Sequence, residues 1–331
     1  MGSTAADGPP APDPELTGRF AAALRALWPG CGQGEYGKAG LAVSGGPDST
    51  ALLLLAASAF PGEVEAATVD HGLRPEAARE AADVARLCER LGVHHEVLKV
   101  DVAPGNVQAE ARRARYAALT GWIERRGLGA LLTAHHADDQ AETLLLRLNR
   151  ASGVAGLAGT RARGFVPGTE IPLLRPLLDW RRVELTRIVE AAGIDAAQDP
   201  SNEDDRFDRA RLRKALANTD WLDIDAIAES ASHLADADAA LDWAARREWS
   251  ECVRKEGLGI LYRPKAPRAV ALRVIARIAK ELEGSEPRGS AVARLFDALL
   301  ARQPGSIGDL VARPTPDGWS FMKAPKRRAK G

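Results

Sequence analysis

The chain has 331 residues, and its 45 lysines and arginines are balanced by 45 aspartates and glutamates. This length favours two domains with sizeable cores, and the balance excludes the overall basic excess of a chain built mainly to bind nucleic acid. The charge is nevertheless uneven, because residues 261–331 carry 15 basic against 6 acidic side chains, whereas residues 218–260 carry 4 against 10.

Neither cysteine chemistry nor a membrane anchor is indicated by the sequence. Cys31, Cys88 and Cys252 are far apart and form no paired-cysteine motif, so we expect buried thiols in a reducing compartment. No apolar run approaches the roughly 18 residues of a membrane span, and the first residues contain no signal-peptide core. The sequence therefore predicts a cytoplasmic protein without a membrane partner.

Short apolar runs alternate with helical patterns between residues 40 and 193. The predicted strands are 40–43, 63–69, 94–100 and 130–134, and the helices that follow them are 48–57, 75–91, 106–126 and 137–150. An extended segment at 169–180 then precedes a helix at 181–192. This alternation predicts an α/β fold with a parallel, Rossmann-like sheet covered by helices. Because ligands bind beyond the carboxyl ends of such strands, the polar residues at those ends mark the expected site.

The chain is predicted to continue into a second, mainly helical domain. An acidic, turn-rich passage precedes residue 218, where we place the boundary between domains at 17–218 and 219–322. Residues 1–16 and 323–331 are expected to be disordered tails because of their composition.

Within the second domain, long helical periodicity begins near residue 221. Trp221, Trp243 and Trp249 have near-helical spacing there and are expected to belong to its core. The basic side chains of residues 261–331 suit sequence-independent contact with nucleic-acid phosphates.

The first predicted strand is followed by the run Ser44-Gly45-Gly46-Pro47-Asp48-Ser49. Glycines between a strand and a helix let backbone N–H groups surround an anion, and the helix N-terminus adds its positive dipole end. The run lacks the lysine of the G-x-x-x-x-G-K-[ST] motif, so it suits pyrophosphate as a leaving group. Asp48 can hold Mg²⁺ there, and Ser44 and Ser49 can add hydroxyl donors.

Two further segments add ionisable side chains. Asp70 and His71 end the second strand, where the functional interpretation places the adenosine of ATP. Arg112 and Arg115 are three residues apart and share one face of a helix.

The fourth strand ends in the run HHADDQAET, residues 135–143. His135 and His136 suit proton transfer or phosphate contact near neutral pH. Asp138, Asp139 and Glu142 share one face near the start of the next helix, where they can bind a metal or the ammonium group of a cationic substrate. The ligand spacing does not match a zinc site.

These motifs resemble the PP-loop N-type ATP pyrophosphatases, whose fold is the adenine nucleotide alpha hydrolase-like one, and within them the tRNA(Ile)-lysidine synthetase family. The matching segments follow that family's order: SGGPDS, DHGLRPE, ARRARY, HHADDQAET, SG..GLAG, RPLL, and DPSN followed by Arg209 to Arg213. The resemblance is continuous from about Gly40 to Lys214 and weak beyond Asn218.

The resemblance implies ligation of L-lysine to carbon 2 of the wobble cytidine in tRNA(Ile) with a CAU anticodon. ATP would adenylate oxygen 2 with release of diphosphate, and the lysine amine would then attack carbon 2 with release of AMP.

The resemblance also implies a role for each matching residue. Ser44, Gly45, Gly46, Pro47, Asp48 and Ser49, with Asp70 and His71, would bind ATP, and Asp48 would hold its Mg²⁺. The implied catalytic residues are Asp48, Arg112, His135 and Asp139, of which Arg112 and His135 would act on the reacting phosphate or cytidine. Asp139 and Glu142 would contact lysine, and Arg209 and Arg213 would face the tRNA or the phosphates.

Two departures from the family pattern are present. Ala151 stands where glycine is frequent, and Ala210 stands where asparagine is common. Two alternatives stay open: a PP-loop tRNA thiolation enzyme, which generally needs a cysteine near its site, and a nucleotide-binding sensor without turnover. The sequence also leaves open whether the protein is a monomer or a homodimer.

Overall fold

The computed structural model describes residues 11–32, 37–72, 75–101, 107–197 and 208–324. The chain divides into two compact units, residues 1–234 and 235–331. The division falls inside helix α9 (Ile224–Cys252), beyond the boundary predicted at residue 218. Of the two predicted tails, residues 1–10 and 325–331 lie outside the described residues. The prediction of disorder is wrong for residues 14–16, which begin helix α1 (Pro14–Leu27), and for Lys323, which ends strand β11 (Gly318–Lys323).

The first unit contains a six-stranded sheet with the strand order β3-β2-β1-β4-β6-β5. Five of its strands are parallel: β1 (Ala39–Ala42), β2 (Val64–Asp70), β3 (His94–Lys99), β4 (Ala130–Leu132) and β6 (Pro172–Leu174). Strand β5 (Arg163–Phe165) pairs antiparallel with β6 at the edge. The predicted parallel α/β sheet is confirmed.

The helices of this unit begin and end close to the predicted positions. They are α2 (Pro47–Ala59), α3 (Pro75–Leu91), α4 (Val107–Arg126), α5 (Ala137–Leu148) and α7 (Arg182–Ala191). The sequence did not predict α1 (Pro14–Leu27), α6 (Val154–Leu157) or α8 (Asp208–Ala217). Helix α8 lies within the passage predicted to be turn-rich, because its many charged residues hide the apolar spacing of a helix.

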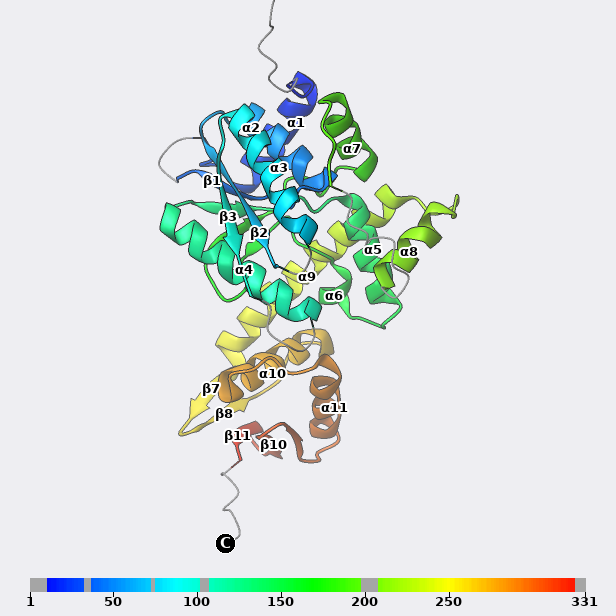
Figure 1. Ribbon diagram of the computed structural model, residues 1–331. Helices are drawn as coiled ribbons and strands as arrows, with labels where there is room; N and C mark the ends of the chain where they lie inside the picture. Colours follow the sequence, from blue (N-terminus) through cyan, green and yellow to red (C-terminus); the bar gives the residue numbers. More distant parts are fainter. Residues whose placement is uncertain (1–10, 33–36, 73–74, 102–106, 198–207, 325–331) are drawn as a thin grey trace, which may run out of the picture. The chain divides into compact units, whose positions relative to one another are not determined.

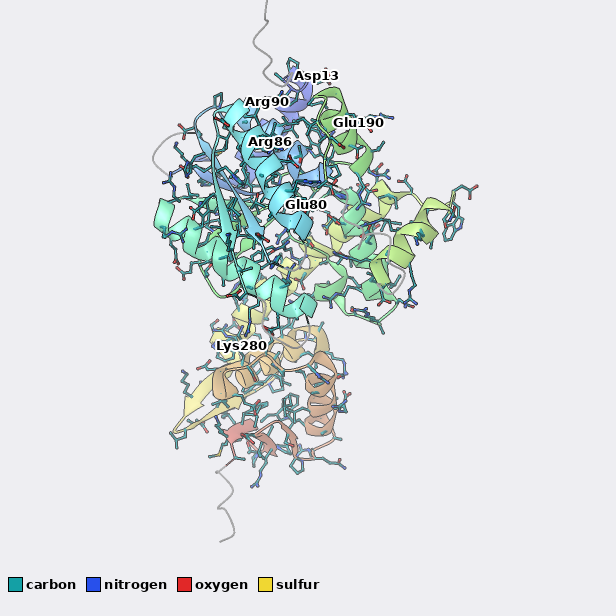
Figure 2. All side chains as sticks on the ribbon, viewed as in Figure 1. Asp13, Glu80, Arg86, Arg90, Glu190 and Lys280 are labelled. Carbon is teal, nitrogen blue, oxygen red and sulfur yellow. The ribbon has the colours of Figure 1, made fainter. Side chains whose placement is uncertain are left out.

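Helices cover both faces of the sheet (Figure 1). One core combines buried residues of α1, α2, α3 and α7 with those of β1, and another joins α4 to β4 and β6. Helix α3 buries Val84, Leu87 and Cys88, whereas its charged residues Arg86 and Arg90 lie on the exposed side (Figure 2). This amphipathic spacing is what allowed the helix to be predicted.

The strand order places the site. From β1 the chain moves to β2 and β3 on one side and then crosses back to β4 on the other, so β1 pairs with both β2 and β4. The carboxyl ends of β1 and β4 are therefore adjacent at the point where the order reverses, which is where open α/β sheets bind ligands. The segment 43–46 after β1 and the segment 133–136 after β4 meet there.

The second unit contains a five-stranded antiparallel sheet that was not predicted. Its order is β7 (Val253–Glu256), β8 (Gly259–Tyr262), β11 (Gly318–Lys323), β10 (Leu310–Thr315) and β9 (Gly305–Ile307). Helices α10 (Arg268–Glu283) and α11 (Gly289–Leu300) share a core with this sheet. Such short strands carry too little alternation to be recognised from sequence.

The expectation for the tryptophans is wrong at two positions. Trp221 is 79% exposed and Trp243 is 59% exposed, whereas Trp249 packs against the second unit's core below the guanidinium of Arg277. Helical spacing does not show which side of a long helix will be covered. In the part of the chain that the structure describes, every helix is too short or too polar to cross a membrane.

Ala151 occupies a backbone conformation that usually requires glycine. It follows α5 with a φ of 51°, and its N–H donates to the Leu148 carbonyl at 3.0 Å while that of Ser152 donates to Arg147 at 3.0 Å. This left-handed residue ends the helix, and a side chain makes the conformation unfavourable. The departure from glycine noted in the sequence therefore has a structural cost.

We expect Ala151→Gly to raise the free energy of unfolding by about 0.5–1 kcal/mol, because relief of left-handed strain exceeds the added entropy of the unfolded chain. Urea unfolding measures the change. The matched control is Ala117→Gly at an exposed position within α4, which should lower the free energy of unfolding by about 1 kcal/mol. Destabilisation by both substitutions would contradict the assignment of strain to Ala151.

Candidate active site

The glycine-rich run after β1 forms a strand-to-helix turn. Gly45 has a φ of 90°, Gly46 is the N-cap of α2 in an extended conformation, and Pro47 is the first helical residue. No side chain in the described part of the chain caps this helix. The N–H groups of its first turn are therefore available to an anion, as predicted for residues 44–49.

The two serines of the run have different environments. Ser49 is buried, and its Oγ accepts a hydrogen bond from the Ser44 N–H at 3.1 Å and donates to the Gly46 carbonyl at 3.0 Å. It therefore fixes the shape of the turn. Ser44 is exposed, and its Oγ lies 3.1 Å from that of Ser49. Of the two hydroxyls, that of Ser44 is the more accessible to a phosphate.

The end of β2 contributes the predicted Asp70 and His71. Asp70 accepts a hydrogen bond from the Gly72 N–H at 2.9 Å, which shapes the turn. Nδ1 of His71 is buried without a hydrogen-bond partner among the described residues. Burial lowers the pKa of His71, and the positive charge of Arg115 lowers it further, so the ring is neutral near pH 7.

His136 joins the two halves of the site. Its imidazole is fully buried, and Nε2 lies 3.4 Å from Asp48 Oδ2 and 3.5 Å from Asp139 Oδ2. Nδ1 lies 3.5 Å from Asp138 Oδ2. One ring thus connects the carboxylate of the glycine-rich run with both acids at the start of α5.

The charges in this cluster follow from these contacts. Burial acts to lower the pKa of His136, but the carboxylates of Asp138, Asp48 and Asp139 outweigh it and raise the pKa to about 9. Burial acts to raise the pKa of Asp138, but hydrogen bonds from His136, the Arg182 backbone and Arg181 hold it well below its usual range. At neutral pH the cluster is an imidazolium surrounded by carboxylates.

His135 has the opposite protonation. Burial lowers its pKa to about 4, and the charges of Arg175, Arg115 and Arg112 add to that effect, although Asp139 opposes it. Nδ1 of the ring lies 2.9 Å from Thr133 Oγ1. His135 is therefore a neutral imidazole with one donor and one acceptor, suited to hydrogen bonding rather than to charge pairing.

Glu142 and Arg213, both predicted to bind substrate, contact each other. Glu142 is buried, and Arg213 donates to its carboxylate at 2.8 Å and 3.3 Å. A second cation, Arg182, lies 3.6 Å away. Arg209 lies one turn earlier on α8, is exposed, and donates to Thr143 Oγ1 at 3.1 Å. Both predicted arginines of α8 thus contact α5.

Arg112 lies on α4 with its guanidinium 5.0 Å from the ring centre of Tyr116. Arg115 lies over the same ring at 5.2 Å. The positive charges of Arg112 and Arg115 both lower the pKa of His135. Arg112 is therefore close enough to the site to act on it electrostatically. The DPSN motif, residues 199–202, lies outside the described residues.

Three arginines of the site were not predicted. Arg181 contacts Asp138 at 3.3 Å, the Arg182 N–H donates to the same carboxylate at 2.8 Å, and Arg175 is buried near His135. Arg175 belongs to the RPLL motif, which the sequence analysis matched to the family without giving the arginine a function. No pattern indicated Arg181 and Arg182, because they reach the site only through the fold.

A divalent cation fits beside Asp48. Oδ1 of Asp48 is buried and has no hydrogen-bond partner among the described residues, while Oδ2 faces His136. A hard oxygen ligand of this kind suits Mg²⁺ that is shared with phosphate oxygens. The described residues contain no group of three or more His, Cys, Asp or Glu able to hold a metal ion on their own.

All three cysteines are free and buried, as predicted. Burial raises the pKa of Cys31 to about 11 and that of Cys88 to about 12, and it also raises the pKa of Cys252. None of them is therefore a reactive thiolate near neutral pH. This weakens the thiolation alternative.

Comparison with known proteins shows the family to which the chain belongs. A family model described as the PP-loop domain matches residues 22–220. A tRNA(Ile)-lysidine synthase of Novosphingobium aromaticivorans is 47% identical over 315 residues, which cover 94% of each chain. The corresponding protein of Zymomonas mobilis is 41% identical over 88% of this chain and 90% of its own.

Among solved structures, the fold is similar to that of a U34-tRNA thiolase from Methanococcus maripaludis. The TM-score is 0.53 and the sequence identity 15%, over 66% of this chain and 78% of the thiolase. At this identity the likeness concerns the fold alone.

The two adjacent histidines should make opposite contributions to stability as pH changes. Because the folded pKa of His136 is raised to about 9, its ion pairs are fully present below the unfolded pKa of about 6.5 and are lost as pH rises through 9. Because the folded pKa of His135 is lowered to about 4, its neutral form costs stability as pH falls from about 6.5 to 4.

The measurement is urea unfolding of the wild type, His136→Asn and His135→Asn without ATP or divalent cations. The advantage of the wild type over His136→Asn should shrink between pH 6.5 and 9, whereas His135→Asn should gain on the wild type below pH 6.5. Parallel pH profiles for all three proteins would contradict the two assigned charge states.

Proposed function

The chain belongs to the tRNA(Ile)-lysidine synthase family, which forms lysidine in tRNA, and on that premise we propose how its residues divide the reaction. The substrates are ATP, L-lysine and tRNA(Ile) with a CAU anticodon, and Mg²⁺ accompanies ATP. The observation that supports this assignment best is the buried cluster in which His136 joins Asp48 to Asp138 and Asp139. It unites the phosphate-binding turn with the acids proposed to receive lysine.

The ATP phosphates are proposed to bind at the turn of residues 44–49. The first N–H groups of α2 face the anion, Ser44 adds its hydroxyl, and Asp48 Oδ1 holds Mg²⁺. When bound, the cation withdraws charge from the leaving diphosphate. Asp70 and His71 at the end of β2 line the proposed adenosine site, where a neutral His71 ring presents no charge to the base.

The amine of lysine is proposed to bind between Asp139 and Glu142. Asp139 is held by the His136 backbone N–H at 3.3 Å, and Glu142 is buried one turn further along α5. These carboxylates would hold the amine close to carbon 2 of the adenylated cytidine. The attack then takes place between two bound groups, which avoids the entropy cost of a bimolecular encounter. Neutral His135, with one donor and one acceptor, is proposed to hydrogen-bond the reacting phosphate or cytidine.

The partner tRNA is proposed to contact both units. Arg209 and Arg213 on α8 lie beside the acids of α5, and residues 261–331 supply the basic excess of the second unit. Contacts of that kind with phosphates make tRNA binding sensitive to salt.

Asp48→Asn and Asp139→Asn should separate the two chemical steps. We expect Asp48→Asn to reduce both tRNA-dependent diphosphate release and incorporation of labelled lysine by about 100-fold or more, because both depend on the first step. Asp139→Asn should reduce incorporation far more than diphosphate release. Asp83→Asn, an exposed substitution on α3, serves as the control. Diphosphate release with a different tRNA and without lysine incorporation would overturn the lysidine assignment.

Glu142→Gln should raise the KM for lysine about 10-fold or more while the KM for ATP stays within about 3-fold, because it removes one charged hydrogen-bond partner of the amine. Steady-state kinetics with labelled lysine measure both constants. Glu190→Gln on α7 is the matched control, since Glu190 is exposed (Figure 2). Equal increases in both KM values would contradict a specific lysine contact.

A further inference from the structure

Three arginines near the site have no acidic partner in the described part of the chain. Arg112 and Arg115 lie on α4, and Arg175 directly follows β6. Several arginines of the first unit do pair with carboxylates, for example Arg126 with Glu65 and Arg213 with Glu142. A cluster of unpaired guanidinium groups is unfavourable unless an anion joins it.

Arg175 is the buried member of this cluster. It is 9% exposed, Nη1 donates to the Arg161 carbonyl at 2.6 Å, and Nε is buried without a hydrogen-bond partner among the residues that the structure describes. The backbone contact anchors one end of the guanidinium. The unused Nε and the uncompensated charge are not explained by that anchor.

The three guanidinium groups lie around one aromatic ring. Arg112 and Arg115 stand 5.0 Å and 5.2 Å from the centre of Tyr116, whose hydroxyl is buried without a partner among the described residues. Arg175 lies within electrostatic range of both Tyr116 and Arg112. Burial lowers the pKa of Arg175, Tyr116 opposes that effect, and the charge of Arg112 adds to it.

The neighbouring groups do not neutralise this charge. His135 faces all three arginines and is neutral, and His71 beside Arg115 is neutral as well. Asp139, which also acts on His135, accepts a hydrogen bond from the His136 backbone and lies beside its ring. A guanidinium cluster with neutral hydrogen-bonding rings beside it has the chemistry of a phosphate site.

We propose that Arg175, together with Arg112, binds a phosphate group of a substrate at the reaction centre. This inference rests on the proposed function, because it assumes that the site receives ATP and tRNA. The phosphate has two possible sources, a phosphodiester beside the wobble nucleotide of the tRNA or the α-phosphate of ATP. In this proposal Arg175, the first residue of the RPLL motif, binds and positions the substrate phosphate.

The test compares Arg175→Gln, Arg175→Lys and Arg112→Gln in the full-length protein, with binding of tRNA(Ile) and of ATP each measured without turnover. If the phosphate belongs to tRNA, Arg175→Gln should weaken tRNA binding about 10- to 100-fold and reduce the slope of log K against log salt by about 0.7–0.9. If it belongs to ATP, the affinity for ATP should fall by a similar factor instead. Arg175→Lys should recover part of either loss because it keeps the charge.

The double variant gives a second readout. If Arg112 and Arg175 hold the same phosphate, the double substitution should cost less than the sum of the single ones. Arg112 is exposed, so its variant keeps the proposal testable if Arg175→Gln fails to fold. Unchanged affinities for both ligands in Arg112→Gln and Arg175→Gln would overturn the proposal.

The matched control is Arg163→Gln on the neighbouring strand β5. Arg163 also donates to a backbone carbonyl, that of Leu27 at 2.9 Å, but it is exposed. It should therefore lose a similar structural hydrogen bond without losing affinity. Absence of lysine incorporation would refute the proposed function. The test of the phosphate site would still give a result, because it measures binding and does not require lysine transfer.

Discussion

The ion cluster of His136 is the interaction on which the rest of the site depends. A fully buried imidazole can carry a charge only where carboxylates surround it, and here they come from two separate segments, the turn after β1 and the start of α5. The cluster therefore ties the phosphate-binding turn to the acidic helix start. It also holds Asp48 so that one oxygen faces His136 while the other has no partner within the described part of the chain.

The charged residues around this cluster form two groups. The carboxylates of Asp138 and Glu142 are paired with cations, among them Arg181 and Arg213, whereas Arg112, Arg115 and Arg175 make the region around His135 basic. The reaction brings two polyanions, ATP and tRNA, and the cationic amine of lysine to one carbon atom. Separate groups of charged residues allow each reactant to bind at its own position. The neutral ring of His135 lies at the boundary.

The buried pair of Glu142 with Arg213 bears on the proposed binding of lysine. Arg213 and Arg182 balance the carboxylate in the absence of lysine, and a buried carboxylate without such partners would be costly. An entering ammonium group can share or replace these cations. Arg213 belongs to α8, so the ion pair with Glu142 also joins that helix to α5.

The sequence by itself determined the parallel α/β fold, the limits of most helices around the sheet and the glycine-rich turn, because apolar periodicity and glycine placement are local properties of the chain. It also identified the acids and histidines at the strand ends. Only the tertiary structure decided that His136 is charged while its neighbour His135 is neutral, since protonation depends on Asp48 and on arginines distant in sequence. For the same reason Arg175, Arg181 and Arg182 entered the site only once the fold was known, and the antiparallel sheet of the second unit emerged from pairings between short strands that carry no recognisable pattern individually.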